Sequence, residues 1–345
     1  MMRIYSVSSV LAGAMACVVF SMGVGHAASQ ALIDAAKKEG SVTWYTTLIV
    51  NQMARPAVDA FEKKYGIKVD YIRADTNDIL LRLQNEAKVG KVQADLIDTT
   101  SGTPTLKPLG LLEKWLPDAA SSLPREYIDP EGYWIATSLY ILTLGYNTDL
   151  VPRGSEPKSL RDLLDPKWKG KMAISGSASS PGVGGFIGLA LGSMGEQAGM
   201  DYLRALAQQR PSVIQVSTRQ VLDQVIAGEY SVGLQVLNHH VAFSANRGAP
   251  IGWSKIDPAM AAMLVLGVLK GPHPNAGKLL VDFLMSDEGQ ALFRDADYIP
   301  VAPNIPPKDP GLRPDGTTFK ALYYTPEMID DNIKRWMGIY AETLR

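Results

Sequence analysis

The fold is decided by the stretch SVTWYTTLIVNQMARPAVDAFEKKYGIKVDYI, residues 41–72. Its first part, residues 42–47, is rich in β-branched and aromatic side chains, which predicts a buried strand. Residues 51–65 then carry a helical pattern that Gly66 ends, and residues 67–72 again have the composition of a strand. The order strand, helix, strand is the repeating unit of an α/β domain with a mostly parallel sheet.

The same alternation continues on both sides of this stretch. Ser29 is suited to cap a first helix that Gly40 ends, and residues 77–89 have one apolar face and one polar face, as an amphipathic helix does. Residues 94–98 supply a third strand. Ligands of such sheets bind at the carboxyl ends of the strands, which directs attention to the residues that follow each one.

The length of the chain favours two lobes. A single core stops growing at roughly 250 to 300 residues, and this chain has 345. Residues 135–146 form a long apolar segment that we expect to cross to the second lobe, and residues 261–269 return. The expected organisation is lobe 1 at residues 29–134 and 267–310, lobe 2 at residues 135–266, and a helical tail at residues 311–345 that packs on the lobes.

The N-terminus has the pattern of a secretory signal peptide, which we place at residues 1–28. Arg3 precedes an apolar run over residues 7–24, and small residues follow it. The alternative is a membrane anchor, since a run of this length is barely enough to span a bilayer. Cleavage would remove Cys17, the only cysteine, and leave a mature protein without disulfides or thiolate ligands.

Composition and motifs exclude several functions. The chain has 34 Lys plus Arg against 35 Asp plus Glu, a net charge of -1, so it has no basic field for nucleic acid. Neither a Gly-x-Ser-x-Gly elbow nor a His-Glu-x-x-His motif occurs. We therefore expect no enzymatic activity and no cofactor.

Small polar residues follow two of the predicted strands. Thr46 and Thr47 end the first, and the run Thr-Thr-Ser-Gly at residues 99–102 includes Ser101 and Gly102. Hydroxyls and free backbone amides at such ends bind anions without a formal charge. Helix capping and turn chemistry alone would also favour these residue types, and that alternative stays open.

A serine-rich loop follows the strand at residues 172–174. Ser177, Ser179 and Ser180 lie in it, ahead of an apolar helix over residues 186–191. A helix start offers unpaired amides and a positive dipole end, so this loop is a candidate anion cradle. The alternative is a simple glycine-rich turn. It is not a nucleotide phosphate loop, because the Gly-Lys-Ser/Thr ending is missing.

Two further features lie in lobe 2. Ser217 and Gln220 have capping-box spacing, which places Arg219 in the first turn of a helix. A cation there is unfavourable to the helix dipole. Either a bound anion removes this conflict, or the side chain forms an ion pair at the surface. Farther on, His239 and His240 follow Asn238. Adjacent residues of a helix point about 100° apart, so one metal ion cannot easily take both, and we expect one histidine to face the cleft while its neighbour packs or meets solvent.

Five segments together resemble one family. They are AFEKKYGI at 60–67, GYNTDL at 145–150, DPKWKGK at 165–171, GVLKG at 267–271 and FLMSDEGQ at 283–290. They look like the extracellular solute-binding proteins of ABC importers, in the branch that contains periplasmic ferric-iron-binding proteins. The resemblance implies a type II periplasmic-binding clamshell: two lobes, each a mostly parallel sheet flanked by helices, joined by two crossover strands. It also implies a protein that closes around a ligand and docks on a membrane permease. Docking on a permease needs no self-association, so we expect a monomer, and the signal peptide places it in the periplasm.

The chain departs from the iron-binding members at one place. Those members carry adjacent tyrosines where this sequence has His239 and His240. Phenolates suit Fe(III), whereas imidazoles favour divalent or softer ions. We therefore expect a small anionic solute, a carboxylate, phosphonate or phosphate ester; the alternative is ferric iron, another metal or a metal chelate held by the two histidines. The expected ligand-binding residues are Thr46, Thr47, Ser101 and Gly102 from lobe 1, and Ser177, Ser179, Ser180, Arg219, Asn238, His239 and His240 from lobe 2.

Overall fold

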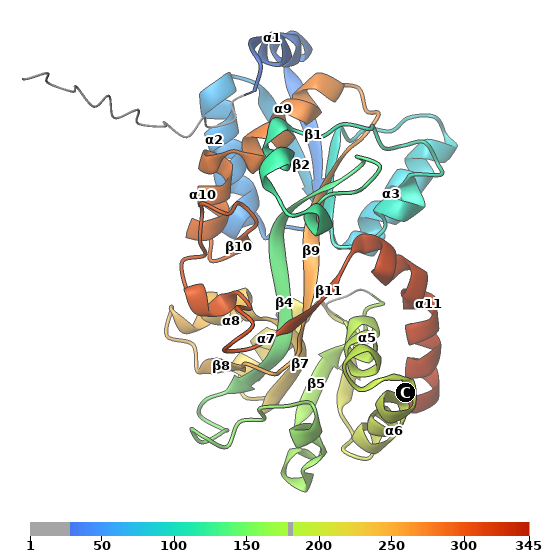
Figure 1. Ribbon diagram of the computed structural model, residues 1–345, viewed down its shortest axis with the longest axis vertical. Coiled ribbons are helices and arrows are strands. Elements are labelled where there is room, and N and C mark those ends of the chain that lie inside the picture. Colours follow the sequence, from blue (N-terminus) through green and yellow to red (C-terminus); the bar gives the residue numbers. More distant parts are fainter. Residues whose placement is uncertain (1–27, 179–181, 345) are drawn as a thin grey trace, which may run out of the picture.

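The computed structural model describes residues 28–178 and 182–344 (Figure 1). The predicted signal peptide lies outside these residues apart from Ala28, as do Ser179 and Ser180 of the serine-rich loop. Among the helices of the described part, none has the length and apolar character needed to cross a membrane.

One mixed sheet runs through the molecule, with its main strands in the order β2-β1-β3-β9-β4-β7-β5-β6. We call the half with β1 (Ser41–Thr46), β2 (Lys68–Arg73) and β3 (Leu96–Thr99) lobe 1. The half with β5 (Met172–Ser175), β6 (Ser212–Ile214) and β7 (Val232–Leu237) is lobe 2. Neighbouring strands within each half are parallel. The predicted pair of lobes, each with a mostly parallel sheet, is confirmed.

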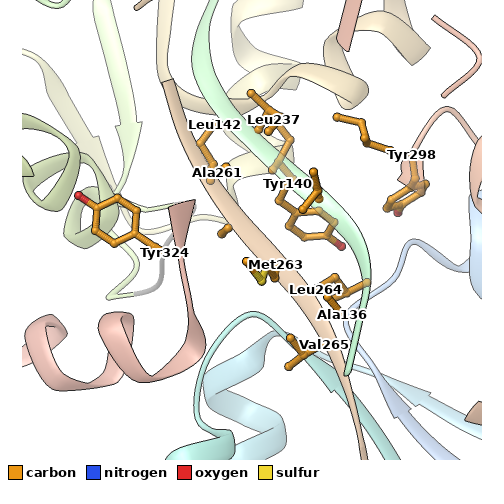
Figure 2. Close-up of a cluster of buried hydrophobic side chains, with 14 of the residues drawn as sticks. Ala136, Tyr140, Leu142, Leu237, Ala261, Met263, Leu264, Val265, Tyr298 and Tyr324 are labelled. Atoms are coloured by element: carbon orange, nitrogen blue, oxygen red, sulfur yellow. The ribbon is translucent and has the colours of Figure 1, made fainter. Parts of the chain in front are cut away.

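Two long strands connect the halves. β4 (Ile135–Asn147) and β9 (Ala259–Val268) pair antiparallel in the middle of the sheet and run from one lobe into the other (Figure 1). Every residue of β9 is buried, as expected for a strand covered on both faces. Their side chains join one core, part of which Figure 2 shows around Tyr140 and Met263. The two crossover strands are thus confirmed, while the residue boundaries of the lobes stay predictions.

Three short strands add to this central pair. β8 (Ile251–Ser254) and β10 (Ile299–Pro300) pair with β4, and β11 (Ala321–Tyr324) pairs with β9. β11 leads directly into the last helix, so the C-terminal tail is anchored on a crossover strand.

Helices cover both halves. Lobe 1 carries α1 (Gln30–Glu39), α2 (Arg55–Tyr65), α3 (Thr76–Lys88), α4 (Thr103–Leu106), α9 (Pro274–Met285) and α10 (Asp287–Asp295). Lobe 2 carries α5 (Val183–Met194), α6 (Glu196–Ala207), α7 (Thr218–Ile226) and α8 (Asn238–Ala245). The last helix, α11 (Pro326–Thr343), lies along α5 and α6 (Figure 1).

The predicted caps of two helices, α1 and α7, are present in the structure. The Ser29 side chain accepts a hydrogen bond from the Leu32 amide, and Gly40 ends α1 in the left-handed conformation. Ser217 and Gln220 form the full capping box of α7.

The single helix predicted over residues 51–65 is wrong in its first part. Val50–Ala54 form a π-helical turn, and the α-helix begins at Arg55. Pro56 has no N–H to continue an α-helical ladder back into that turn. Within the turn, Gln52 points inward and donates a hydrogen bond to the Ala296 carbonyl at 2.7 Å, which ties this segment to α10.

Candidate functional site

A cavity of about 450 Å³ opens between the two lobes. From lobe 1 it is lined by the residues that follow the parallel strands, among them Thr47, Arg73, Asp75 and Thr100, with Thr76 and Asn77 at the start of α3. From lobe 2 it is lined by Ser175, Ser177, Gln215, Leu237, His240 and residues 216–220. Ile49, Tyr140 and Tyr298 complete the wall. The cavity therefore lies at the carboxyl ends of the strands, as the α/β pattern predicts.

The two threonines that end β1 have different surroundings. Thr47 lines the cavity, and its amide and hydroxyl both donate to the Asp98 carboxylate, at 2.8 and 2.6 Å. Thr46 is fully buried and does not line the cavity, and its hydroxyl accepts from the Leu48 amide at 3.1 Å. Of the two, only Thr47 lines the cavity.

The run at residues 99–102 reaches the cavity through Thr100. Ser101 is buried beside it and does not line the cavity. The Gly102 amide donates to both carboxylate oxygens of Asp330, at 2.9 and 3.0 Å. This amide is thus held by α11 instead of pointing at a ligand.

Arg219 lines the cavity from the first turn of α7. Its guanidinium donates to the Ser244 hydroxyl at 3.0 Å and to the Asp223 carboxylate at 2.8 Å. Ser244 in turn donates to the carbonyl of His240 at 3.0 Å. Arg219 therefore forms an ion pair with Asp223 of its own helix, contacts Ser244 of α8, and also lines the cavity.

The two adjacent histidines have different surroundings. His240 lines the cavity, whereas His239 is 0% exposed and packs with its ring centroid 4.5 Å from Tyr298 and 5.3 Å from Tyr140. Asn238 is also buried, and its side-chain amide donates to the Leu312 carbonyl at 2.8 Å.

Burial keeps both imidazoles neutral. It lowers the pKa of His239 to about 3 and that of His240 well below its usual value. Among the residues described, both ring nitrogens of His239 and Nδ1 of His240 have no hydrogen-bond partner. A neutral His240 offers the cavity one donor or one acceptor, depending on its tautomer.

Sequence reasoning missed Arg73, the second cation of the site. It ends β2 and forms an ion pair with Asp75 at 3.1 Å. The signal that would have found it is the rule that drew attention to Thr47, because both residues end neighbouring parallel strands. Tyr140 and Tyr298 were missed as well; burial raises the pKa of both phenols, so they keep their protons at neutral pH.

A buried carboxylate lies behind the cavity wall. Asp98 is fully buried on β3, and burial raises the pKa of its carboxyl group to about 6. Hydrogen bonds to the carboxylate favour its ionised form and partly offset this rise. Those include the two from Thr47. Asp98 thereby fixes the orientation of a lining residue without lining the cavity itself.

The helix starts at the cavity add to its positive character. The first residues of α3 and α7, from opposite lobes, both line it. Helix N-termini carry a partial positive charge and favour anions. Of the lining residues, Arg73 and Arg219 are cations and Asp75 is an anion, so the formal charge of the wall is +1.

No group of three or more His, Cys, Asp or Glu side chains in the described part of the chain is placed to hold a metal ion. His239 is enclosed by aromatic rings, so His240 alone of the predicted pair reaches the cavity.

Comparison with known proteins gives a consistent family. Residues 94–322 match the family described as bacterial extracellular solute-binding protein. The Fe(3+)-binding periplasmic protein of Serratia marcescens is 26% identical over 250 residues, which cover 69% of this chain and 71% of that protein.

Two solved structures share the fold. The iron-bound structure of HitA from Pseudomonas aeruginosa superposes with a TM-score of 0.72 at 22% identity, covering 88% of this chain and 99% of that chain. The structure of the periplasmic binding protein AfuA from Actinobacillus pleuropneumoniae, with exogenous fructose-6-phosphate bound, has a TM-score of 0.75 at 24% identity and covers 88% and 98%. At these identities the likeness extends to the fold alone.

Proposed function

The chain belongs to the bacterial extracellular solute-binding proteins, the ligand-capturing components of ABC importers, and from that premise we propose that it binds a small organic anion between its lobes. The anion is a carboxylate, a phosphonate or a phosphate ester. The protein then delivers it to a membrane permease. We place the protein in the periplasm as a monomer, with residues 1–28 removed as a signal peptide.

The observation that carries this proposal is the pair of arginines that line one cavity from opposite lobes. Arg73 lies at the end of β2 in lobe 1, and Arg219 lies at the start of α7 in lobe 2. A guanidinium has five N–H donors in a planar fork that matches carboxylate and phosphate oxygens. An anion that touches both arginines joins the lobes, and this difference in contacts shifts the population toward a closed state.

The rest of the wall suits an anion with an organic body. Ser175, Ser177 and Ser217 on the lobe 2 side and Thr47 on the lobe 1 side give the wall polar surface without formal charge. The hydroxyls of Thr47 and Ser175 donate to the Asp98 carboxylate and the Val216 carbonyl, so the two arginines provide the charge match for the anion. Tyr140 and Tyr298 add aromatic surface to the wall. A cavity of about 450 Å³ holds more than a bare oxyanion, and ligand pockets of small molecules start at about 300 Å³.

The alternative is a metal or metal-chelate receptor that uses His240. It has in its favour the Nδ1 atom of His240, which has no partner among the described residues. Against it stand the buried position of His239 and the protonated phenols of Tyr140 and Tyr298. Of two proteins with this fold, one has been solved with iron bound and the other with a sugar phosphate bound. The fold is therefore compatible with both classes of ligand.

The test combines native mass spectrometry of protein purified without added metal with a thermal-shift screen. The probes are ferric citrate, zinc, citrate, small dicarboxylates, alkyl phosphonates and hexose phosphates. One anion class should raise the melting temperature, because a ligand that binds the folded state alone stabilises it. The shift should vanish in Arg73→Gln and Arg219→Gln and persist in Arg204→Gln, a matched change on the exposed face of α6. Stoichiometric metal, with a metal-dependent shift that His240→Ala abolishes and the arginine variants keep, would overturn the proposal.

A further inference from the structure

The last helix touches both lobes. Most of α11 packs on α5 of lobe 2, where the ring of Trp336 lies so close to Gly188 that an added Cβ would come within 2.6 Å of it. Ile333 approaches Gly184 in the same way. Just before the helix, the Tyr324 hydroxyl donates to the Gly188 carbonyl at 3.0 Å. The contacts of Ile333 and Trp336 with α5, together with the hydrogen bond of Tyr324, fix this part of the tail to lobe 2.

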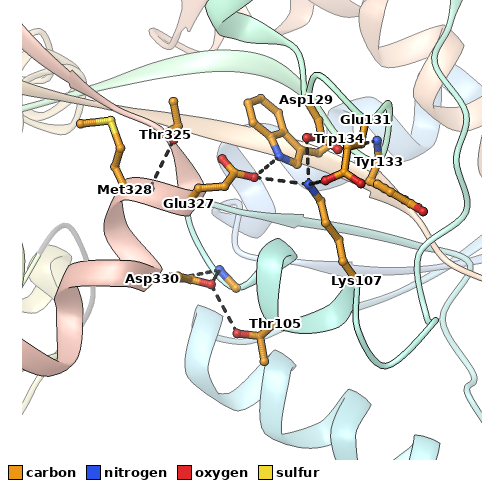
Figure 3. A network of polar contacts seen from close by, with 11 residues as sticks. Thr105, Lys107, Asp129, Glu131, Tyr133, Trp134, Thr325, Glu327, Met328 and Asp330 are labelled. Carbon is orange, nitrogen blue, oxygen red and sulfur yellow. Dashed lines mark hydrogen bonds and ion pairs between the residues drawn. The ribbon is translucent and has the colours of Figure 1, made fainter.

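The first turn of α11 makes polar contacts with lobe 1 (Figure 3). The Glu327 carboxylate accepts from the Trp134 indole N–H at 2.8 Å and lies 3.6 Å from the Lys107 ammonium group. Asp330 accepts from the Gly102 amide at 2.9 and 3.0 Å and from the Thr105 hydroxyl at 3.4 Å. Two carboxylates thus hold the helix start to lobe 1.

These contacts adjoin the wall of the cavity. Gly102 follows directly on residues 99–101, and Thr100 lines the cavity. The Thr99 hydroxyl donates to the Ser101 carbonyl at 2.6 Å and lies 3.2 Å from the hydroxyl of Thr76, another lining residue. Asp330 is therefore linked to the lining residue Thr100 through the backbone of Gly102 and Ser101.

A helix attached to both lobes restrains their relative motion. Lobes that turn about β4 and β9 change the distance between lobe 1 and α5, so the contacts of α11 with one of the two lobes have to give way. A buried apolar contact tolerates small sliding, whereas a hydrogen bond is lost once donor and acceptor separate beyond about 3.5 Å. We therefore expect the polar contacts of α11 with lobe 1 to break before its apolar contacts with α5.

We propose that Glu327 and Asp330 form an interlobe latch, which ties the first turn of α11 to lobe 1 and biases the equilibrium between lobe arrangements. The latch acts in addition to the two crossover strands. It favours the arrangement of this structure, in which all its contacts are made, and its release allows a wider range of separations between the lobes. The inference does not depend on which ligand occupies the cleft.

The test is the distribution of interlobe distances in the dialysed, ligand-free protein, measured by pulsed electron-electron double resonance. Spin labels are placed at two exposed positions, Lys38 on α1 and Glu229 after α7, in a chain with Cys17 replaced by serine. The latch variants are Glu327→Gln, Asp330→Ala and their combination. The matched control is Asp331→Asn, which removes the same charge from an exposed position of the same helix.

The latch variants should shift or broaden the distribution by a few ångströms, and the double variant should do so most. Asp331→Asn should reproduce the parent distribution. Circular dichroism confirms that each variant is folded, and the single variants serve if the double variant is not. Latch variants that superpose on the parent, or a control that shifts as much as they do, would overturn the proposal.

Discussion

The imidazole of His239 packs against the phenol of Tyr298 with ring centroids 4.5 Å apart, in a place where the histidine is fully buried. Tyr140 covers it from another side at 5.3 Å. The neighbouring His240 reaches the cavity instead. One histidine of the pair therefore belongs to the core behind the site, and its ionisation bears on stability more than on ligand contact.

Replacing His239 by phenylalanine should make the protein more tolerant of acid. Burial lowers the pKa of His239 to about 3, below the value near 6.5 of an unfolded chain. The unfolded state thus binds more protons, so the stabilising effect of the neutral histidine is complete above pH 6.5 and falls as the pH drops toward 3. Between pH 7 and 5, His239→Phe should lose about 2 kcal/mol less stability than the parent. Urea unfolding at both pH values measures this, and equal losses in the two proteins would contradict it.

The pH dependence of stability that Asp98 causes should have the opposite sign to that of His239. Burial raises the pKa of Asp98 to about 6, so the folded state holds the proton more tightly than the unfolded chain does. Its favourable contribution is complete below about pH 4 and is lost as the pH rises through 6. Asparagine keeps an oxygen for the two hydrogen bonds from Thr47 and does not titrate.

From pH 4 to 7, the stability of Asp98→Asn relative to the parent should therefore rise by about 2 kcal/mol. Urea unfolding across this range measures the difference. Asp59→Asn, on the exposed face of α2, is the control and should show no such trend. A flat difference for Asp98→Asn would mean that the carboxylate is ionised equally in the folded and unfolded states.

Local patterns in the sequence predicted the alternation of strands and helices and the capped ends of α1 and α7, because strand composition and helix capping depend on neighbours along the chain. The two lobes followed from the chain length, and the crossover strands from long apolar segments and the family resemblance. The same patterns did not distinguish Thr46 from Thr47. Successive residues of a strand point to opposite faces, and which face meets the cleft is decided by the rest of the sheet. The structure buries Thr46 and turns Thr47 to the cavity.

Contacts between distant segments were beyond sequence reasoning for a related reason. Gly102 has the composition of an anion site after a strand, yet its amide is held by Asp330, which is 228 residues away. Nothing in the residues near Gly102 indicates which helix will cover it. Arg73 is a different case. It lies at the carboxyl end of a parallel strand, where ligands of α/β sheets bind, so the sequence did indicate its position. It was missed because only clusters of hydroxyl residues were considered at the strand ends.

Gly188 should resist replacement although it lies inside a helix. Alanine usually stabilises a helix interior by about 0.5–1 kcal/mol relative to glycine. At Gly188, however, the added methyl group would lie 2.6 Å from the ring of Trp336, so Gly188→Ala should destabilise the protein by about 1–3 kcal/mol. Thermal and urea unfolding measure the change.

Gly338 on α11 is the matched control for that substitution. An added Cβ there meets nothing within 4 Å, so Gly338→Ala should stabilise the protein by about 0.5–1 kcal/mol. In a Trp336→Leu background, where the ring is absent, the penalty at Gly188 should disappear. Equal effects of the two glycine substitutions would show that α11 does not pack closely on α5.

The ion pair of Arg219 with Asp223 predicts opposite effects for its two members. Arg219→Lys keeps the charge but loses the fork that contacts Ser244 and Asp223, and it should weaken binding of the best anion from the thermal-shift screen by about 10-fold or more. Asp223→Asn removes a negative charge that competes for the same guanidinium. Because the aspartate is half-exposed, the gain in anion affinity should be modest, about two- to fivefold.

Isothermal titration calorimetry measures the anion affinity of both variants, with Asp201→Asn on α6 as the control. If Asp223→Asn instead weakened binding as strongly as Arg219→Lys does, the aspartate would be positioning the guanidinium for the ligand, and its competition for the charge would be the smaller effect.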